Sequence, residues 1–141
     1  MSVAFFDVDD TILRGSSGVM LAKYMFFTEG EGASPTYIID MVKALIDSKT
    51  GSVEYESLVE KGLSQFSGRS RAEIDRICHG CFDKYIRHGI YRLAYREVRN
   101  HLENGRHVVL LTAILQPLMD PLGDFLGVTK TIALNIHFND G

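Results

Sequence analysis

The sequence predicts an α/β fold in which a parallel sheet carries a helical unit inserted after its first strand. Three short apolar runs indicate buried strands, and residues 14–103, between the first two runs, show helical spacing without a convincing strand. That interval is far longer than an ordinary connection. The chain has 141 residues, 45% of them hydrophobic and 23% charged, as expected for one globular domain. We therefore expect a core from residues 1–13 and 104–141 and a helical cap from residues 14–103.

The three expected strands differ in what surrounds them. Ser2–Phe6 is apolar and stops abruptly at an acidic loop, as a buried strand does when it delivers acids to a site. His107–Thr112 follows Asn104-Gly105, a helix stop. Thr131–Ile136 is the third run, and Asn139-Asp140-Gly141 after it is a hairpin-turn signal that should lead to another strand.

The expected helices are marked mainly by capping residues and apolar periodicity. Serine, serine-proline and capping-box signals precede most of the apolar stretches in the inserted unit. We expect helices from Ser16/Ser17 to Thr28, after Ser34-Pro35, from Ser52 to about Ser67-Gly68, from Ser70 through Ile86, from Ile90 to Leu102 and, beyond the second strand, over Leu115–Phe125.

Charge and hydropathy exclude several classes of protein. Fifteen Lys and Arg residues oppose 18 Asp and Glu residues, so the formal net charge of -3 provides no basic field for nucleic acid or an acidic membrane surface. Apolar stretches such as Val3–Phe6 are far shorter than the roughly 20 residues that span a bilayer. The two cysteines and the lack of a basic leader before Asp7 lead us to expect a cytoplasmic protein.

Asp7-Val8-Asp9 places two carboxylates two residues apart, directly after the first strand. Such residues face one side of extended backbone, and open α/β sheets bind ligands at this end of their strands. The pair suits a carboxylate nucleophile with a second carboxyl as general acid/base, and Mg²⁺ to offset phosphoryl charge. Thr11 and the N–H groups of the turn add donors for phosphate oxygens. The spacing alone fits equally a solvated loop whose aspartates cap the next turn.

The whole phrase Phe5–Leu13, a hydrophobic strand followed by D-x-D-x-T, resembles motif I of the haloacid dehalogenase-like (HAD) superfamily. Thr112, with Ala113 after it, resembles motif II, in which a Ser or Thr at the end of the next core strand binds the phosphoryl group. The position and length of the helical insert resemble the C1 cap of the phosphoserine-phosphatase-like branch, subfamily IB. The resemblance covers the entire chain and implies a HAD-like (Rossmann-like) parallel sheet.

The resemblance also implies roles for individual residues. Asp7 would be the nucleophile that forms an aspartyl phosphate, and Asp9 the acid/base that protonates the leaving group and then activates water. Asp7 and the carbonyl of Asp9 would hold Mg²⁺, while Thr11, Thr112 and Ala113 would bind the phosphate. A second Asp at this position separates the family's phosphotransferases from its dehalogenases, so Asp9 indicates phosphoryl chemistry.

The chain departs from the family pattern in two places. Asp10 stands where many members have Gly. A lysine (motif III) and an acidic loop (motif IV) normally follow the third strand, and the sequence ends at Gly141 before either, so we expect a partial sheet. Lys130 precedes the third strand and is expected to be exposed rather than catalytic. Asp120 and Asp124 share one helix face and are expected to face solvent.

Two further groups of residues invite a chemical interpretation. Cys78-His79-Gly80-Cys81 contains a C-x-x-C, but a structural zinc needs a second pair of ligands, and both cysteines fall on an apolar helix face. We therefore expect buried thiols. Four arginines near the return to the core are expected to form a solvated helix face, with binding of an anionic leaving group as the alternative: Arg87, Arg92, Arg96 and Arg99.

The leading hypothesis is a HAD-like phosphatase that hydrolyses a small phosphorylated metabolite with Mg²⁺. The alternatives are a catalytically deficient HAD-like domain that binds a ligand or partner, and a phosphomutase or other phosphotransferase. No nucleic-acid or membrane partner is expected. Because the family's sheet places another strand beside the first one, a partial sheet would expose an apolar edge at Val3–Phe6, through which we expect self-association.

Overall fold

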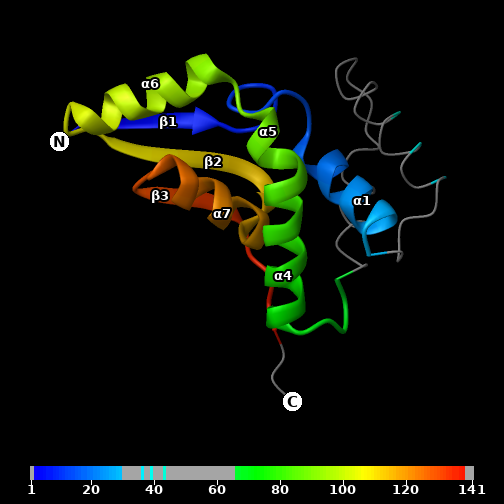
Figure 1. The fold of residues 1–141 in the computed structure, drawn as a ribbon. Helices are drawn as coiled ribbons and strands as arrows, with labels where there is room; N and C mark the ends of the chain where they lie inside the picture. Colours follow the sequence, from blue (N-terminus) through cyan, green and yellow to red (C-terminus); the bar gives the residue numbers. More distant parts are fainter. Residues whose placement is uncertain (1, 30–35, 37–38, 40–42, 44–65, 139–141) are drawn as a thin grey trace.

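A computed structural model describes residues 2–29, 36, 39, 43 and 66–138 (Figure 1). These residues form a three-stranded parallel sheet of order β1-β2-β3, with β1 at Val3–Asp7, β2 at His107–Leu115 and β3 at Lys130–Leu134. The α/β fold with a parallel sheet is therefore confirmed. β2 continues three residues past its expected end at Thr112, because its pairing with β3 shifts register after Leu111 and resumes at Leu115. The expected turn at 139–141 lies outside the described residues.

The helices lie close to their expected positions. Ser16 caps the first one by accepting the Val19 N–H at 3.3 Å, and Ser70 and Glu73 form the expected capping box. The helices expected after Ser34-Pro35 and from Ser52 fall outside the described residues. The described helices are α1 (Ser17–Phe27), α4 (Arg71–Cys81), the π-helical turn η1 (Phe82–Ile86), α5 (Arg87–Gly89), α6 (Arg92–Glu103) and α7 (Gln116–Leu126).

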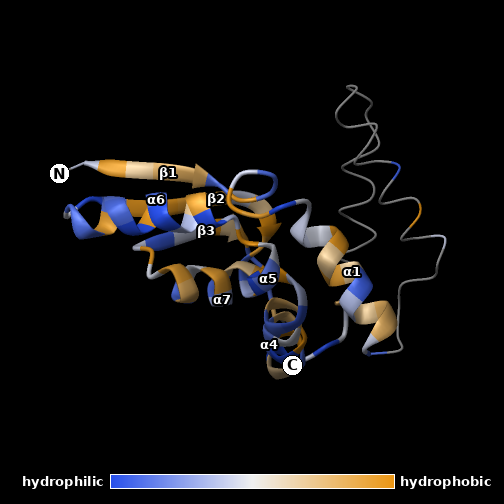
Figure 2. Ribbon diagram, turned by 45° about the horizontal axis from the view of Figure 1, so that its top comes forward, coloured by the Kyte–Doolittle hydropathy of each residue, from blue (hydrophilic) through white to orange (hydrophobic). Residues whose placement is uncertain are grey.

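One face of the sheet is covered by α6 and α7. Consecutive parallel strands in the order β1-β2-β3 require right-handed crossovers, which place the connecting helices on the same side. The two helices meet through the rings of Tyr95 and Phe125, whose centroids are 5.8 Å apart. Beneath them, Val108 and Leu110 of β2 are completely buried. The hydrophobic core therefore lies between the sheet and this helix layer, where β1 and β2 are largely apolar (Figure 2).

The opposite face of the sheet is bare among the described residues. Its side chains alternate along each strand with those that face the helices, and the paired register aligns Phe5 with Val109 and Leu111 with Ile132. Val109, on the central strand, is buried, whereas its neighbours on this face are exposed. Phe5 is 64% exposed, and other apolar side chains on this face are also exposed: Val3, Leu111, Ile132 and Leu134. Purely parallel sheets are normally covered on both faces, so this surface is unusual.

The helices α4, η1 and α5 follow one another without a break and stand at one end of the sheet (Figure 1). α4 packs against α7 on one side and α1 on the other. α6 lies against β2 and α7 rather than against the continuous helical segment of α4, η1 and α5. The division of the chain into core and cap at 13/14 and 103/104 stays a prediction. Among the described stretches, no helix combines the length and the apolar character needed to cross a membrane.

Candidate active site

The acidic loop after β1 is anchored by a buried turn. Val8, Ile12 and Leu13 are fully buried, and the Val8 carbonyl accepts N–H groups from Thr11 (3.2 Å), Ile12 (2.9 Å) and Leu13 (3.0 Å). The sequence supports this turn because apolar residues stand on both sides of Asp9 and Asp10: Val8 before them, and Ile12 and Leu13 after them. The acids therefore stand on a backbone fixed by the core.

Asp7 and Thr112 lie at the same edge of the sheet. Asp7 is the last residue of β1 and pairs in register with Leu111, so Thr112 is the next residue along the neighbouring strand. Asp7 is exposed, Thr112 is half-buried and Ala113 is exposed. The Thr112 hydroxyl accepts the Ile114 N–H at 3.3 Å, within the segment where the pairing of β2 with β3 shifts register. Asp7, the predicted nucleophile, and Thr112, the predicted phosphate ligand, therefore lie on neighbouring strands at the carboxyl edge of the sheet.

Asp9 is half-buried and is held by the start of α1. Its Oδ1 accepts the Ser17 backbone N–H at 3.0 Å. Burial raises the pKa of the Asp9 carboxyl above its ordinary value, the hydrogen bond from the Ser17 N–H opposes this rise, and the negative charges of Asp7 and Asp10 add to it. A raised pKa favours the protonated carboxyl, which is the form that a general acid requires.

Asp10 adopts the left-handed backbone conformation, with φ of 58°. This explains why the resemblance places Gly here, because Gly has no Cβ penalty in that region. Asp is also tolerated there when its side chain bonds locally. The Asp10 Oδ1 accepts the Gly15 N–H at 3.2 Å, and the Asp10 N–H donates to the Gly15 carbonyl at 3.1 Å. The substitution therefore preserves the loop.

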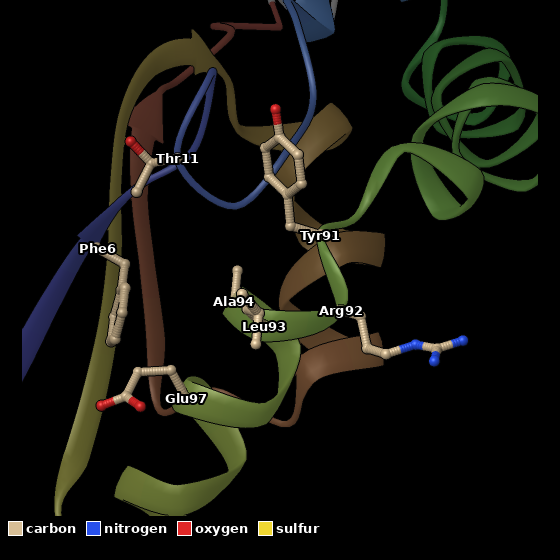
Figure 3. Close-up of a pocket in the computed structure, with 7 residues that line it drawn as sticks. All are labelled: Phe6, Thr11, Tyr91, Arg92, Leu93, Ala94 and Glu97. Carbon is tan, nitrogen blue, oxygen red and sulfur yellow. The ribbon is translucent and has the colours of Figure 1, made fainter.

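Thr11 is exposed and lines an open, mostly apolar groove of about 550 Å³ between the end of β1 and the start of α6 (Figure 3). Neither Asp7 nor Asp9 belongs to the lining of this groove, so the phosphate contact expected of Thr11 stays a prediction. The lining residues are Phe6, Thr11, Tyr91, Arg92, Leu93, Ala94 and Glu97.

The loop after β1 also forms backbone hydrogen bonds with the residues at and just beyond the end of α5. The Arg14 N–H donates to the Gly89 carbonyl at 2.8 Å, and the Tyr91 N–H donates to the Ile12 carbonyl at 2.9 Å. The Arg14 guanidinium lies 5.4 Å from the centre of the Tyr91 ring. Sequence reasoning missed these contacts and the one between Ser17 and Asp9, because they join segments whose proximity no local pattern reports.

The donors for a cation are few. Asp7 offers a carboxylate and Asp9 a carbonyl, both hard oxygen ligands of the kind that Mg²⁺ prefers. Within the described stretches, no cluster of three or more His, Cys, Asp or Glu side chains could hold a metal. The residues therefore suit Mg²⁺ in kind, but an ion held here would retain water or substrate oxygens for most of its coordination.

The cysteine pair is structural. Cys78 and Cys81 are free thiols with no exposed surface. Burial raises the pKa of each thiol to about 12, so both stay protonated and unreactive at neutral pH. The expectation of buried thiols is confirmed.

The remaining charged candidates lie on the surface. Asp120 and Asp124 are exposed as expected, and Lys130 is exposed at the start of β3. Arg87 pairs with Asp83 at 2.8 Å, and Arg99 lies 3.9 Å from Glu103, which agrees with a solvated helix face.

The comparisons with known proteins agree with this geometry. Phosphoserine phosphatase SerB1 of Mycobacterium tuberculosis is 28% identical over 144 residues, which cover 99% of this chain and 46% of that protein. A Bordetella pertussis protein of unknown function has a solved structure that matches with a TM-score of 0.81 and 26% identity, covering 99% of this chain and 63% of that one. A phospho-aspartyl intermediate analogue of phosphoserine phosphatase shares the fold, with a TM-score of 0.67, 15% identity, and coverage of 99% and 59%.

The chain therefore spans about half the length of the curated relative. The profile of the haloacid dehalogenase-like hydrolase family matches residues 4–141, nearly the whole chain and the entire candidate site. The acidic loop after β1, the threonine on β2 and this match lead to one conclusion: the chain belongs to the haloacid dehalogenase-like hydrolase family.

Proposed function

We propose that the chain hydrolyses small phosphomonoesters through an aspartyl phosphate on Asp7. The observation that carries this proposal is the pair of acids on one anchored loop: Asp7 exposed at the end of β1, and Asp9 two residues later with a raised pKa. An exposed carboxylate suits a nucleophile, whereas a partly buried carboxyl with a raised pKa suits a proton donor. The similarity to phosphoserine phosphatase SerB1 supports the same reaction class.

The reaction divides between the two side chains. A carboxylate oxygen of Asp7 attacks phosphorus, the bond from phosphorus to the leaving oxygen breaks, and Asp9 gives its proton to that oxygen. The ionised Asp9 then takes a proton from water as the water oxygen attacks the phosphorus. The bond to Asp7 breaks, inorganic phosphate leaves, and both carboxyl groups return to their starting states.

Mg²⁺ is the cofactor that this proposal includes. The Asp7 carboxylate and the Asp9 carbonyl would hold it, with water and phosphate oxygens as its other ligands. When bound, Mg²⁺ would offset the negative charge of the phosphoryl group and of Asp7. Thr112, the Ala113 N–H and Thr11 would contribute hydrogen bonds to phosphate oxygens, which adds further compensation for that charge.

A second candidate is a domain that binds a phosphorylated ligand without turning it over. It is favoured by the small number of cation ligands, because no cluster of three or more His, Cys, Asp or Glu side chains in the described stretches could hold a metal. A phosphotransferase or phosphomutase, in which an alcohol replaces water as the acceptor, would use the same first step and is the third candidate.

The test is Mg²⁺-dependent hydrolysis of p-nitrophenyl phosphate. We expect Asp7→Asn and Asp9→Asn each to lower kcat by at least about 100-fold, the usual effect of losing a nucleophile or a general acid/base. Asp124→Asn, which removes an exposed carboxylate from α7, is the matched control and should leave the rate unchanged. Equal rates for the wild type and Asp7→Asn would overturn the proposal. Phosphate binding by both proteins without turnover would then favour the second candidate.

A further inference from the structure

Ser17 is the first residue of α1 and lies against the candidate acid/base. Its N–H donates to Asp9 Oδ1 at 3.0 Å across eight residues of sequence. Ser17 is also the one buried polar residue in the described part of the chain, with no exposed surface. Burying a serine costs free energy unless its polar atoms form hydrogen bonds, so this buried position calls for an explanation.

The start of α1 divides its donors between two acceptors. The first N–H groups of a helix have no partner inside the helix. The Ser16 hydroxyl accepts the Val19 N–H, which leaves the Ser17 N–H for the Asp9 carboxyl. The contact with Asp9 is therefore additional to ordinary capping, and it joins the loop after β1 to the first helix of the inserted unit.

The Ser17 hydroxyl supplies an independent observation. Its Oγ is buried and makes no hydrogen bond with any residue that the structure describes. The residue that holds Asp9 through its N–H therefore also carries a buried hydroxyl whose hydrogen-bonding capacity is unused within the described part of the chain.

We propose that Ser17 is the positioning residue for Asp9, holding Oδ1 so that Oδ2 is the oxygen that exchanges a proton with the substrate. This inference rests on the proposed function, because it assigns a role within the reaction of Asp7 and Asp9. In a protonated carboxyl, one oxygen accepts and the other donates, so an acceptor contact at Oδ1 leaves the proton on Oδ2. Any movement of α1 would then move the acid, and a displacement of about 1 Å can cost on the order of 100-fold in rate.

The decisive variant is Ser17→Pro. Proline removes the N–H, and the first position of a helix tolerates it. The preceding residue, Ser16, already has the extended backbone that a following proline requires, with φ of -107° and ψ of 125°. Ser17→Ala is the companion, because it keeps the N–H and removes only the hydroxyl. Ser16→Ala is the matched control, because it weakens the same helix start without touching Asp9.

The readout is kcat/KM with two substrates that differ in their need for an acid, an alkyl phosphate and 2,4-dinitrophenyl phosphate. An alkoxide must be protonated as it leaves, whereas dinitrophenolate leaves without help. We expect Ser17→Pro to lower kcat/KM for the alkyl phosphate by about 10- to 100-fold and to change that for the dinitrophenyl ester by less than about 3-fold. Asp9→Asn should show the same contrast, and Ser16→Ala should affect both substrates equally. An equal loss on both substrates, or no loss, in Ser17→Pro would overturn the inference.

A second measurement does not depend on activity. The Ser17 amide should exchange slowly with solvent in the wild type and at least about 10-fold faster in Asp9→Ala, as a lost hydrogen bond predicts. Asp10→Ala is the control, because it should accelerate exchange at Gly15 but not at Ser17. Unchanged exchange at Ser17 in Asp9→Ala would overturn the positioning role. The proposed function would fail separately, by equal rates in the wild type and Asp7→Asn.

Discussion

Gly123 lies where α7 packs against Thr131 of β3, and replacing it with alanine tests how tightly these elements pack. It is a buried residue inside α7. A Cβ at this position would lie 2.8 Å from Cγ2 of Thr131 and 3.4 Å from Cγ2 of Val128. The first distance is too short for two carbon atoms, so either the Thr131 methyl or the helix must move.

The expected change in the free energy of unfolding is the difference between a steric cost and a gain in helix stability. Forcing an extra methyl into a packed core costs about 1–3 kcal/mol. Alanine in a helix interior is more stable than glycine by roughly 0.5–1 kcal/mol, which offsets part of that cost. We therefore expect Gly123→Ala to lower the free energy of unfolding by about 1–2 kcal/mol.

The assay is urea denaturation followed by circular dichroism, with the midpoint and slope both fitted. Thr131→Ser is the relieving change, because it removes the obstructing methyl and keeps the hydroxyl that accepts Gln116 Nε2 at 2.6 Å. In that background Gly123→Ala should become neutral or stabilising, which gives a coupling energy of about 1–3 kcal/mol. If the alanine costs the same with and without the Thr131 methyl, the steric reasoning is wrong.

Three further predictions concern the thiols, a helix start and the edge strand. Cys78 and Cys81, with each pKa raised to about 12, should react slowly with Ellman's reagent at pH 8 until urea unfolds the chain. The preference of the folded state for protonated thiols contributes fully to the free energy of unfolding below the unfolded pKa of 9.0, and this contribution is lost as pH rises towards 12. Rapid labelling of the folded protein at pH 8 would contradict the prediction of slow reaction. Ser70→Ala should cost about 1 kcal/mol in thermal unfolding, because it removes the cap of α4, and an unchanged Tm would count against the capping box. Light scattering should show self-association of the wild type, and Phe5→Lys should reduce it, because a lysine on the edge strand β1 opposes pairing with another chain. A wild type that stays monomeric at high concentration would refute this prediction.

Local patterns were sufficient for most of the fold. The apolar run ending at Asp7 predicts β1, and the serine and glutamate at positions 70 and 73 predict the start of α4. Helical spacing places Cys78 and Cys81 on the buried face, as the structure has them. Each of these features depends on residues within one or two turns of each other, so the sequence contains the whole signal.

The end of β2 could not be predicted in the same way. The strand was expected to end at Thr112 and continues to Leu115, because the pairing resumes at Leu134 of β3 after the shift in register. Among the described residues, the strand order β1-β2-β3 places β1 at an edge of the sheet. Register depends on the partner strand, which no window of one strand can report.

The sequence by itself determined which reactive residues the chain carries and where they stand: a carboxylate pair at the end of the first strand, a threonine on the second, and through both a resemblance to the haloacid dehalogenase-like family, to which the chain belongs. The tertiary structure decided which groups surround that pair. Only the folded chain brings the Ser17 N–H to Asp9 and the Arg14 N–H to the Gly89 carbonyl, and burial in that fold is the largest cause of the raised pKa of Asp9. Residue types and short spacings are local properties, whereas desolvation and long-range hydrogen bonds arise when distant segments exclude water together.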